Sequence, residues 1–458
     1  MANRLCVIGL DCVTPQFLFG PWLQEMPNVR RLMEGAIHGH LVSTIPPITV
    51  PAWMSMMTSQ DPGMLGIHGF RNRASREYED VYIVNGRHVQ AKPLWHHLSK
   101  AGLNSIVLGV PLTYPPTPLR GVMASCFLTP GKDVTWTFPA TLGAKLDHWA
   151  GGDFILDTPD FRTLDKRQIL DQIYRMTRGR FKAYRKLLSV EPWDFTIMVE
   201  MGPDRVHHAF WRYGDPTHPL YEAGNEYEDV IHRYYLDMDE EIGRTINSLP
   251  ESTSVVVVSD HGAKAMHGAF CINEWLIQEG LLALKPGVTT PTRLQPKMID
   301  FDRTQVWSDG GYYARIFLNV AGREPRGTIP AAEVDGFKRD LRAKLEATTD
   351  DQGRPLGTRV FLPEEVYRQS NGTPPDLIVY LGDLDWRSAS TVGAGIHMFE
   401  NDTGPDDANH AQEGIFIWQG RGKPARAASN KVSIYDVAPS ILDYYGIEAP
   451  AEMIGKVL

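Results

Sequence analysis

"SVVVVSDHG", residues 254–262, is the stretch of sequence that decides the fold. Its four consecutive valines form an apolar run that ends at once in Asp260 and His261. Near-continuous runs of β-branched residues are typical of strands that are buried on both faces, as in a parallel sheet. Ligands bind beyond the carboxyl ends of such strands. The Asp-His pair therefore stands where a functional site is expected.

Similar apolar runs recur along the chain and alternate with helical patterns. The other runs lie at residues 4–11, 104–111, 194–204, 376–383 and 413–420. Helical patterns lie at residues 92–102, 167–189 and 227–249, and a terminal helix is expected within 432–446. This alternation predicts an α/β fold with a doubly wound, mostly parallel central sheet flanked by helices.

The middle of the second half differs in composition from the rest of the chain. Residues 284–298 are rich in proline and threonine, which indicates a connection. The more polar segment that follows, 299–372, carries a strand-like run of its own at 312–320. We therefore predict a catalytic core formed by residues 1–298 and 373–458, with 299–372 as an inserted small subdomain.

Composition narrows the class of protein. The net charge of −9 argues against binding to a nucleic-acid polymer, which needs a basic surface. No run approaches the ~20 apolar residues of a membrane span, and the "MANR" before the first run is too short for a signal peptide. None of the four cysteines forms a C-x-x-C pair, which favours free thiols in a reducing compartment. We expect a soluble, cytoplasmic protein.

Three acids stand at the ends of predicted strands. Asp11 ends the first run, Asp204 follows the run that begins at 194, and Asp260 ends the valine run together with His261. A single aspartate at a strand end is more often a turn or helix-cap residue. Three acids at the same edge of one sheet favour a shared site.

Two further histidines extend this set. His208 stands four residues after Asp204, so a helix starting near Pro203 would place both on one face, where they could share a metal ion. The simpler alternative is an N-terminal aspartate with an exposed histidine. His410 lies in a polar loop before the last run and is a candidate ligand because the set lacks one. Aspartate with histidine suits zinc, manganese or iron better than calcium.

"TIPPITVPAW", residues 44–53, places Thr49 between two prolines, just before a helix expected near Ala52. A rigid connector is the simple interpretation. The alternative is a nucleophile, since coordination to a metal ion activates an alcohol at neutral pH. The free N–H groups at a helix start would also favour an anion beside Thr49.

Together these pieces resemble the alkaline phosphatase superfamily, in particular the prokaryotic members of its type I phosphodiesterase/nucleotide pyrophosphatase branch. The matching motifs are "VIGLD" (7–11), "PPITVPAW" (46–53), "GPDRVHHAFW" (202–211), "VVSDHG" (257–262) and "NHAQEGIF" (409–416). The resemblance implies two divalent metal ions, zinc by preference and manganese as the alternative. One site would use Asp11, Thr49, Asp260 and His261, and the other Asp204, His208 and His410. It also implies that Thr49 forms a covalent phosphothreonine that water hydrolyses.

Candidates for substrate contacts are less specific. The branch places a phosphate-binding asparagine shortly after a His-Gly pair, and here Asn72 stands one position away from that place, followed by Arg73. Lys264, just after the Asp-His-Gly motif, is within reach of a phosphate oxygen or is simply solvated. His218 resembles a motif of prokaryotic relatives, or it belongs to the structure of a loop.

The sequence thus predicts a metal-dependent hydrolase of phosphodiester or nucleotide pyrophosphate bonds, acting on a small phosphate ester. A phosphomonoesterase or a phosphoryl-group transferase on the same site is the alternative within enzymes. A non-catalytic metal-bound scaffold or sensor is the alternative from another class, and it would be expected to lack some of the seven residues. A sulfatase is disfavoured, because its cysteine or serine is replaced by Thr49. Oligomeric state is left open.

Overall fold

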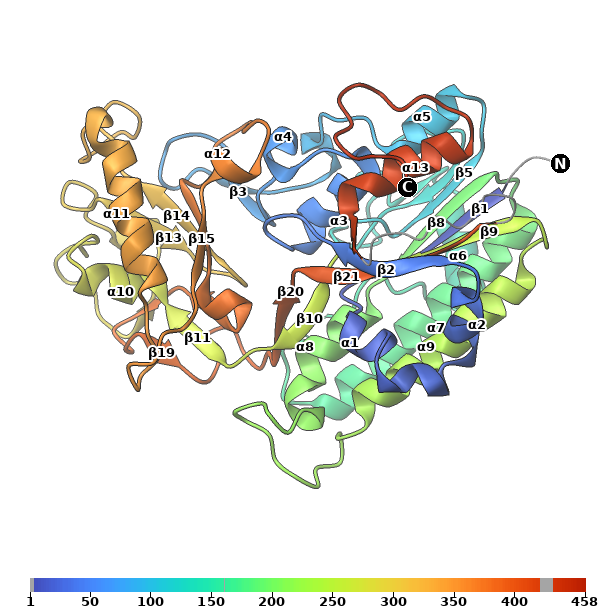
Figure 1. Cartoon of the computed structure of the whole chain (residues 1–458), viewed down its shortest axis with the longest axis horizontal. Helices are drawn as coiled ribbons and strands as arrows, with labels where there is room; N and C mark the ends of the chain where they lie inside the picture. The colour runs from blue at the N-terminus through green and yellow to red at the C-terminus, as the bar shows by residue number, and fades with distance from the viewer. Residues whose placement is uncertain (1–3, 160, 421–430) are drawn as a thin grey trace.

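A computed structural model describes residues 4–159, 161–420 and 431–458 of the chain. The chain forms two lobes (Figure 1). The larger lobe is built on a nine-stranded sheet, and the smaller lobe on a four-stranded antiparallel sheet. Most of the larger lobe comes from the N-terminal part of the chain, and the C-terminal end lies beside it in Figure 1.

The large sheet has the strand order β22-β2-β21-β9-β1-β8-β5-β6-β7. Its five central strands are parallel: β9 (Thr253–Val258), β1 (Arg4–Leu10), β8 (Phe195–Glu200), β5 (Ser105–Leu108) and β6 (Gly121–Ala124). The edges are formed by β7 (Thr137–Phe138), β21 (Glu413–Gln419), β2 (Ile37–Val42) and β22 (Lys431–Ser433). In the register of the centre, Val7 pairs with Ile197 on one side and Val256 on the other.

Helices cover both faces of this sheet, and β1 shows why. Its alternate side chains Cys6 and Ile8 belong to one hydrophobic cluster, whereas Leu5 and Val7 belong to another. The first cluster is completed by α2 (Pro27–Met33), α6 (Leu142–Ala150), α7 (Lys166–Val190), α8 (Gly202–Gly214) and α9 (Val230–Ser248). The second is completed by α3 (Thr49–Thr58), α5 (Leu94–Lys100) and α13 (Val437–Tyr444). The predicted α/β fold with a mostly parallel, helix-flanked sheet is confirmed.

The helix α7 illustrates how sequence determines an element. Asp165 caps it by accepting a hydrogen bond from the Gln168 N–H at 3.0 Å. Its buried face includes Ile169, Ile173 and Met176, at the spacing of an amphipathic helix. The observed helix extends the predicted 167–189 by one residue at each end.

The run at 376–383 differs from the expectation of a strand in the parallel sheet. Its strand, β16 (Leu377–Tyr380), lies instead in the antiparallel sheet of the smaller lobe. Leu377 and Val379 contact one hydrophobic cluster, while Ile378 and Tyr380 contact another. A continuous apolar run shows only that both faces of a strand are buried, and this strand is buried on both faces within a different sheet. The run at 413–420 forms β21, which is antiparallel to β9.

The smaller lobe joins β16 to β13 (Val306–Asp309), β14 (Ala314–Leu318) and β15 (Arg359–Phe361). It also contains α10 (Ile272–Gln278), α11 (Val334–Glu346), and a sheet of β17 (Trp386–Ala389), β11 (Gly268–Cys271) and β19 (His397–Met398). Its hydrophobic cluster takes in side chains between Phe270 and Trp386, together with Tyr78. The domain boundaries at 299 and 372 stay a prediction. We propose that the smaller domain also includes β11, α10 and β17, which lie outside these boundaries.

Short elements connect these layers. They are α1 (Pro15–Leu18), α4 (Pro62–Leu65), α12 (Pro363–Val366), β3 (Arg71–Arg73), β4 (Val81–Ile83), β10 (Gly262–Ala265), β12 (Thr292–Arg293), β18 (Thr391–Val392) and β20 (Ala408–Ala411). The four cysteines are free and buried. Within the described ranges, no helix combines the length and the hydropathy that crossing a bilayer requires.

Candidate active site

Three buried carboxylates meet at the carboxyl edge of the parallel strands. Asp11 follows β1, Asp260 follows β9, and Asp204 lies in the first turn of α8, which follows β8. Asp11 Oδ1 and Asp260 Oδ2 have no hydrogen-bond partner among the described residues. Burial raises the pKa of Asp11 and of Asp260, and the charge of a neighbouring aspartate raises each further. Such a set of acids is suited to hold cations.

Three histidines complete the set, and their hydrogen bonds fix how their rings are used. The Nδ1 atoms of His261 and His410 lie 3.1 Å and 2.8 Å from the backbone oxygens of Gly262 and Pro47. Because a carbonyl oxygen only accepts, each Nδ1 carries a proton and each Nε2 presents a lone pair. His261 Nε2 lies 3.2 Å from Asp260 Oδ2. This is the arrangement expected of imidazoles that bind metal through Nε2.

His208 is oriented in the same way by a carboxylate. Its Nδ1 lies 2.7 Å from Asp406 Oδ1, and its Nε2 lies 3.2 Å from Asp204 Oδ1 and 3.3 Å from His410 Nε2. Burial lowers the pKa of His208, but Asp406 and Asp204 outweigh it and bring the pKa to about 9. Two acids thus hold this ring in place from either side.

The ligand atoms gather in two groups. Asp11, Asp260 and His261 form one, and Asp204, His208 and His410 form the other; within each group the atoms lie within 4.8 Å of one another. A third combination among the described residues reuses two of these histidines with Cys12. Mixed oxygen and nitrogen donors, with two carboxylate oxygens that accept no hydrogen bond from the described residues, fit divalent ions such as zinc or manganese.

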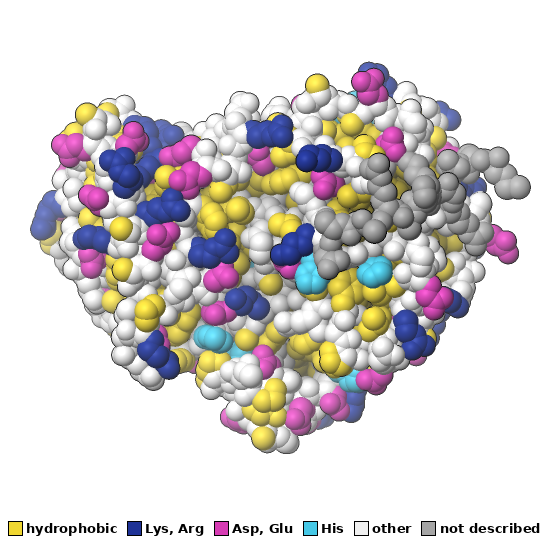
Figure 2. All heavy atoms as spheres, in the orientation of Figure 1, with side chains coloured by type: hydrophobic (Ala, Val, Ile, Leu, Met, Phe, Trp, Pro, Cys, Tyr) yellow, Lys and Arg dark blue, Asp and Glu magenta, His cyan; other side chains and the backbone are white. Residues whose placement is uncertain are grey.

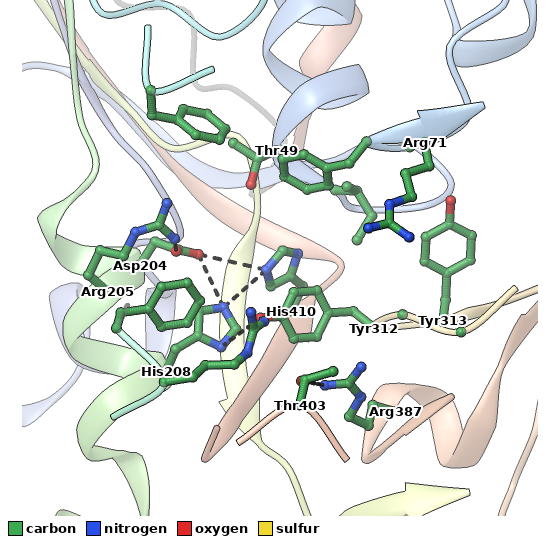
Figure 3. Close-up of a pocket in the computed structure, with 18 of the residues that line it drawn as sticks. Thr49, Arg71, Asp204, Arg205, His208, Tyr312, Tyr313, Arg387, Thr403 and His410 are labelled. Carbon is green, nitrogen blue, oxygen red and sulfur yellow. Dashed lines mark hydrogen bonds and ion pairs between the residues drawn. The ribbon is translucent and has the colours of Figure 1, made fainter. Parts of the chain in front are cut away.

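Thr49 lies beside the first group. The helix α3 begins at Thr49, three residues earlier than expected, with Ile48 as its N-cap. Pro51 fits in the first turn because its missing N–H would have no acceptor within the helix. Thr49 Oγ1 lies 3.2 Å from His261 Nε2, and in Figure 3 the hydroxyl points toward Asp204 and His410.

A cavity of about 400 Å³ opens at this place. Thr49, Asp204, His208 and His410 line it, together with Tyr312 of the smaller lobe. Figure 3 shows these residues converging from elements that are far apart in the sequence. The second ligand group therefore faces the same space as the Thr49 hydroxyl.

Several residues of the site had not been anticipated. Trp53 donates a hydrogen bond to Asp11 Oδ2 at 2.6 Å, and its place one helical turn after Thr49 was a usable signal. Asp406 supports His208, but its sequence neighbourhood carried no such signal. The ring of Tyr312 stacks on His208 with a centroid distance of 4.9 Å, while its hydroxyl donates to Asp406 Oδ2 at 3.0 Å. No local pattern could link that tyrosine to the site.

The predicted substrate residues Asn72 and Arg73 do not line the cavity. Asn72 accepts a hydrogen bond from the His68 N–H at 2.8 Å and so holds a turn. The guanidinium of Arg73 is buried over the ring of Trp307, 5.2 Å from its centroid. Their neighbour Arg71 does line the cavity.

Lys264 and His218 also lie outside the cavity lining. Lys264 Nζ forms an ion pair with Asp385 Oδ1 at 2.5 Å. His218 Nδ1 accepts a hydrogen bond from the Leu220 N–H at 3.1 Å, within its own loop. A role in substrate binding for these four residues stays a prediction.

Comparison with known proteins places this geometry in a family. The family model for type I phosphodiesterase/nucleotide pyrophosphatase matches residues 5–406. No curated protein matches the chain in sequence.

Solved structures share the fold. Human ectonucleotide pyrophosphatase/phosphodiesterase 5 is 14% identical with a TM-score of 0.53, covering 98% of this chain and 96% of that one. The murine protein is 15% identical with a TM-score of 0.52 and the same coverage, 98% and 96%. An inactive threonine-to-alanine variant of the murine protein, in complex with AMP, is 14% identical with a TM-score of 0.54, again covering 98% and 96%. The family match spans most of the chain, so this hydrolase belongs to the type I phosphodiesterase/nucleotide pyrophosphatase family of the alkaline phosphatase superfamily.

Proposed function

We propose that the chain hydrolyses small phosphodiesters or nucleotide pyrophosphates, with Thr49 as the nucleophile between two bound divalent ions. One observation carries this proposal: the Thr49 hydroxyl touches His261 of one ligand group and shares its cavity with the other group. Family membership supports phosphodiester hydrolysis as the reaction class.

In the proposed reaction, Thr49 Oγ1 forms a bond to phosphorus while the bond to the leaving oxygen breaks on the opposite side. Water then attacks the phosphothreonine and restores the hydroxyl. Divalent ions in the two groups would lower the pKa of the alcohol and stabilise charge on the phosphoryl oxygens. The N-terminal end of α3 adds the positive end of the helix dipole beside the phosphate.

The surrounding residues would hold this geometry. The carbonyls of Gly262 and Pro47 keep His261 and His410 in the tautomer that presents Nε2. The indole of Trp53 fixes one oxygen of Asp11 and leaves the other without a partner.

A substrate panel tests the proposal. The protein, loaded with zinc or with manganese, is given bis(p-nitrophenyl) phosphate, p-nitrophenyl phosphate and the p-nitrophenyl ester of thymidine 5′-monophosphate. The nucleotide ester is included because a murine structural neighbour binds AMP. We expect turnover of the diesters, and we expect Thr49→Ala to lower kcat by a factor on the order of 10³ or more with bound metal retained.

Thr58→Ala is the matched control. Thr58 is buried at the other end of α3, where its hydroxyl donates to the Met54 oxygen at 2.7 Å. This variant should keep its activity. Full activity of Thr49→Ala would remove Thr49 from the mechanism, and fewer than two bound ions per chain after metal loading would contradict the two-site proposal.

A phosphomonoesterase is the second candidate, and the arginines of the cavity favour it. Arg205 lines the cavity, and its guanidinium lies beside Asp204, although hydrogen bonds to Asp204 and Asp157 balance much of its charge. A monoester dianion needs more cationic donors than a diester monoanion does. Faster turnover of p-nitrophenyl phosphate than of either diester would support this candidate.

The metal and the compartment also belong to the proposal. We propose zinc by preference and manganese as the alternative, to be decided by comparing kcat/KM after loading with each ion. The four free, buried thiols support a reducing compartment such as the cytoplasm.

A further inference from the structure

The cavity has an unusual share of positive charge. Within the part of the chain that the structure describes, six arginines line it, against two aspartates: Arg71, Arg162, Arg205, Arg293, Arg315 and Arg387 against Asp157 and Asp204. The whole chain, by contrast, has a net charge of −9. On the face shown in Figure 2, basic and acidic side chains are interspersed. A cavity that concentrates one sign of charge attracts ligands of the opposite sign.

Three of these arginines are already engaged with acids. Arg205 Nη2 lies 2.7 Å from Asp157 Oδ2, and Arg162 Nε lies 2.8 Å from Asp406 Oδ2. Arg315 makes a third pair, with Nη2 at 3.1 Å from Asp309 Oδ2. Their charges are largely balanced by the protein itself.

Arg71 and Arg293 are different. Both residues are exposed and line the cavity. Among the residues that the structure describes, neither guanidinium has an ion pair or a hydrogen bond. Neither arginine is therefore needed to hold the fold together.

Arg387 is buried but incompletely partnered. Its side chain is 7% exposed, and its Nη1 donates to Thr403 Oγ1 at 3.0 Å. Its ion pair with Asp402 is long, with 3.8 Å between Nη2 and Asp402 Oδ1. Its Nε has no hydrogen-bond partner within the described ranges. A buried cation with no carboxylate in close contact is costly unless an anion balances its charge.

These three arginines come from three separate strands. Arg387 lies in β17, and Arg293 lies in β12, where it pairs with Thr391 just beyond β17. Arg71 comes from β3. In Figure 3, Arg71 and Arg387 lie across the view from Asp204 and His208. The cavity thus has a reacting end at Thr49 and a separate cationic end.

We propose that this cationic end binds a second anionic group of the substrate, a phosphate or a carboxylate, apart from the phosphate that Thr49 attacks. The inference rests on the proposed function, and it narrows the substrate to diesters with an anionic tail. The planar guanidinium fork matches both phosphate and carboxylate oxygens, and it stays charged at any physiological pH.

Matched substrates test this subsite. p-Nitrophenyl propyl phosphate provides a neutral tail, and its analogues carry a terminal phosphate or a terminal carboxylate on the propyl chain. A series of longer linkers covers the span of the cavity. The measured quantity is the ratio of kcat/KM for the charged-tail substrate to kcat/KM for the neutral-tail substrate. We expect a ratio of about ten or more for at least one linker, from the strength of a charge-assisted hydrogen bond.

Variants of the cavity arginines test whether these side chains cause the preference for a charged tail. Arg71→Gln and Arg293→Gln change exposed residues, and each should lower the ratio by a factor of about three or more, toward one. Arg120→Gln is the matched control. Arg120 is exposed and stands at the amino end of β6, whereas the cavity lies at the carboxyl ends of the parallel strands. It removes the same charge and should leave the ratio unchanged. A wild-type ratio near one for every linker, or an unchanged ratio in both cavity variants, would overturn the proposal.

Binding to Thr49→Ala separates this proposal from the proposed function. Calorimetry compares the charged-tail and neutral-tail diesters on this variant and on Thr49→Ala combined with Arg71→Gln. Tighter binding of the charged tail that depends on Arg71 supports the subsite even if the wild-type protein hydrolyses neither diester, a result that would contradict the proposed function alone. Equal binding of the two diesters would overturn the subsite whatever the turnover.

Discussion

The hydrogen bond between Asp406 and His208 decides which nitrogen of that ring faces Asp204. Asp406 is buried, and the positive charges of His208 and Arg162 hold its pKa below its usual range although burial alone would raise it. It is therefore ionised at neutral pH. An ionised acceptor on Nδ1 increases the electron density at Nε2, where a metal ion would bind.

Replacing Asp406 tests this role at the scale of one residue. Asp406→Asn keeps the size of the side chain but removes its charge. We expect the affinity for zinc to fall by about 10- to 100-fold, which is typical for a residue that supports a metal ligand. Competition with a chelator of known affinity measures it. Asp171→Asn, at an exposed position of α7, should leave the affinity unchanged. Equal zinc affinity in the wild type and in Asp406→Asn would contradict the role.

Close packing between β1 and α3 positions Asp11 at the scale of elements. A Cβ atom added to Gly9 would lie 2.5 Å from Trp53 Cη2 and 3.0 Å from Val199 Cγ2. Trp53 is the residue that donates to Asp11, so displacement of its ring would also move the donor. Glycine at position 9 lets the helix that carries Thr49 approach the strand that leads to Asp11.

Gly9→Ala should therefore destabilise the protein by about 1–3 kcal/mol, as overpacking of a core does. It should also weaken metal binding through the displaced tryptophan. Urea unfolding measures the first effect. Gly336→Ala in α11 is the control, and it should change the free energy of unfolding in the opposite direction. The added Cβ meets only Arg339 Nη2, at 3.8 Å. It should raise the free energy of unfolding by about 0.5–1 kcal/mol. A Gly9→Ala protein as stable as the wild type would contradict the packing argument.

The strands show which parts of the fold the sequence can and cannot predict. The strands before Asp11, Asp204 and Asp260 could be predicted, because a buried parallel strand leaves a continuous apolar run and its polar end marks the ligand edge. The run at 376–383 was placed in the wrong sheet, because such a run carries no information about its hydrogen-bonded neighbours.

Residues that meet only across the lobes were beyond prediction from the chain. Arg71 and Arg387 are separated in sequence by helices and strands of both lobes, and no periodicity links them. The predicted contact Arg73 stands two residues from Arg71, so the local motif was close, but the side chain that reaches the cavity depends on how β3 packs.

At the scale of the whole molecule, the smaller lobe completes the site, because it supplies Tyr312 and Arg387. His68 lies where the two lobes pack. Its Nε2 lies 3.5 Å from the Asn371 oxygen, its ring is 5.8 Å from that of Tyr367, and its backbone oxygen accepts a hydrogen bond from Tyr313. Burial lowers the pKa of His68 to about 4, from the ordinary histidine value of 6.5.

This pKa predicts how acid weakens the packing of the lobes. Between pH 6.5 and pH 4 the unfolded chain binds a proton at position 68 that the folded chain excludes, so stability falls as the pH falls. The loss reaches at most about 3.5 kcal/mol, at roughly 1.4 kcal/mol per pH unit. His68→Gln should remove this part of the pH dependence, as measured by urea unfolding at pH values across the window. Both proteins are treated with chelator, so that release of metal does not contribute.

Other buried histidines keep part of the slope in the variant, since burial also lowers the pKa of His207 to about 3 and that of His218 to about 4. The informative quantity is therefore the difference between the two proteins. His38→Gln, at an exposed position, should follow the wild-type curve. If His68→Gln followed it as well, His68 would be protonated equally in the folded and unfolded chain. That result would mean that protonation of His68 does not destabilise the contact between the lobes. The burial of this ring would then contribute nothing to the pH dependence of stability.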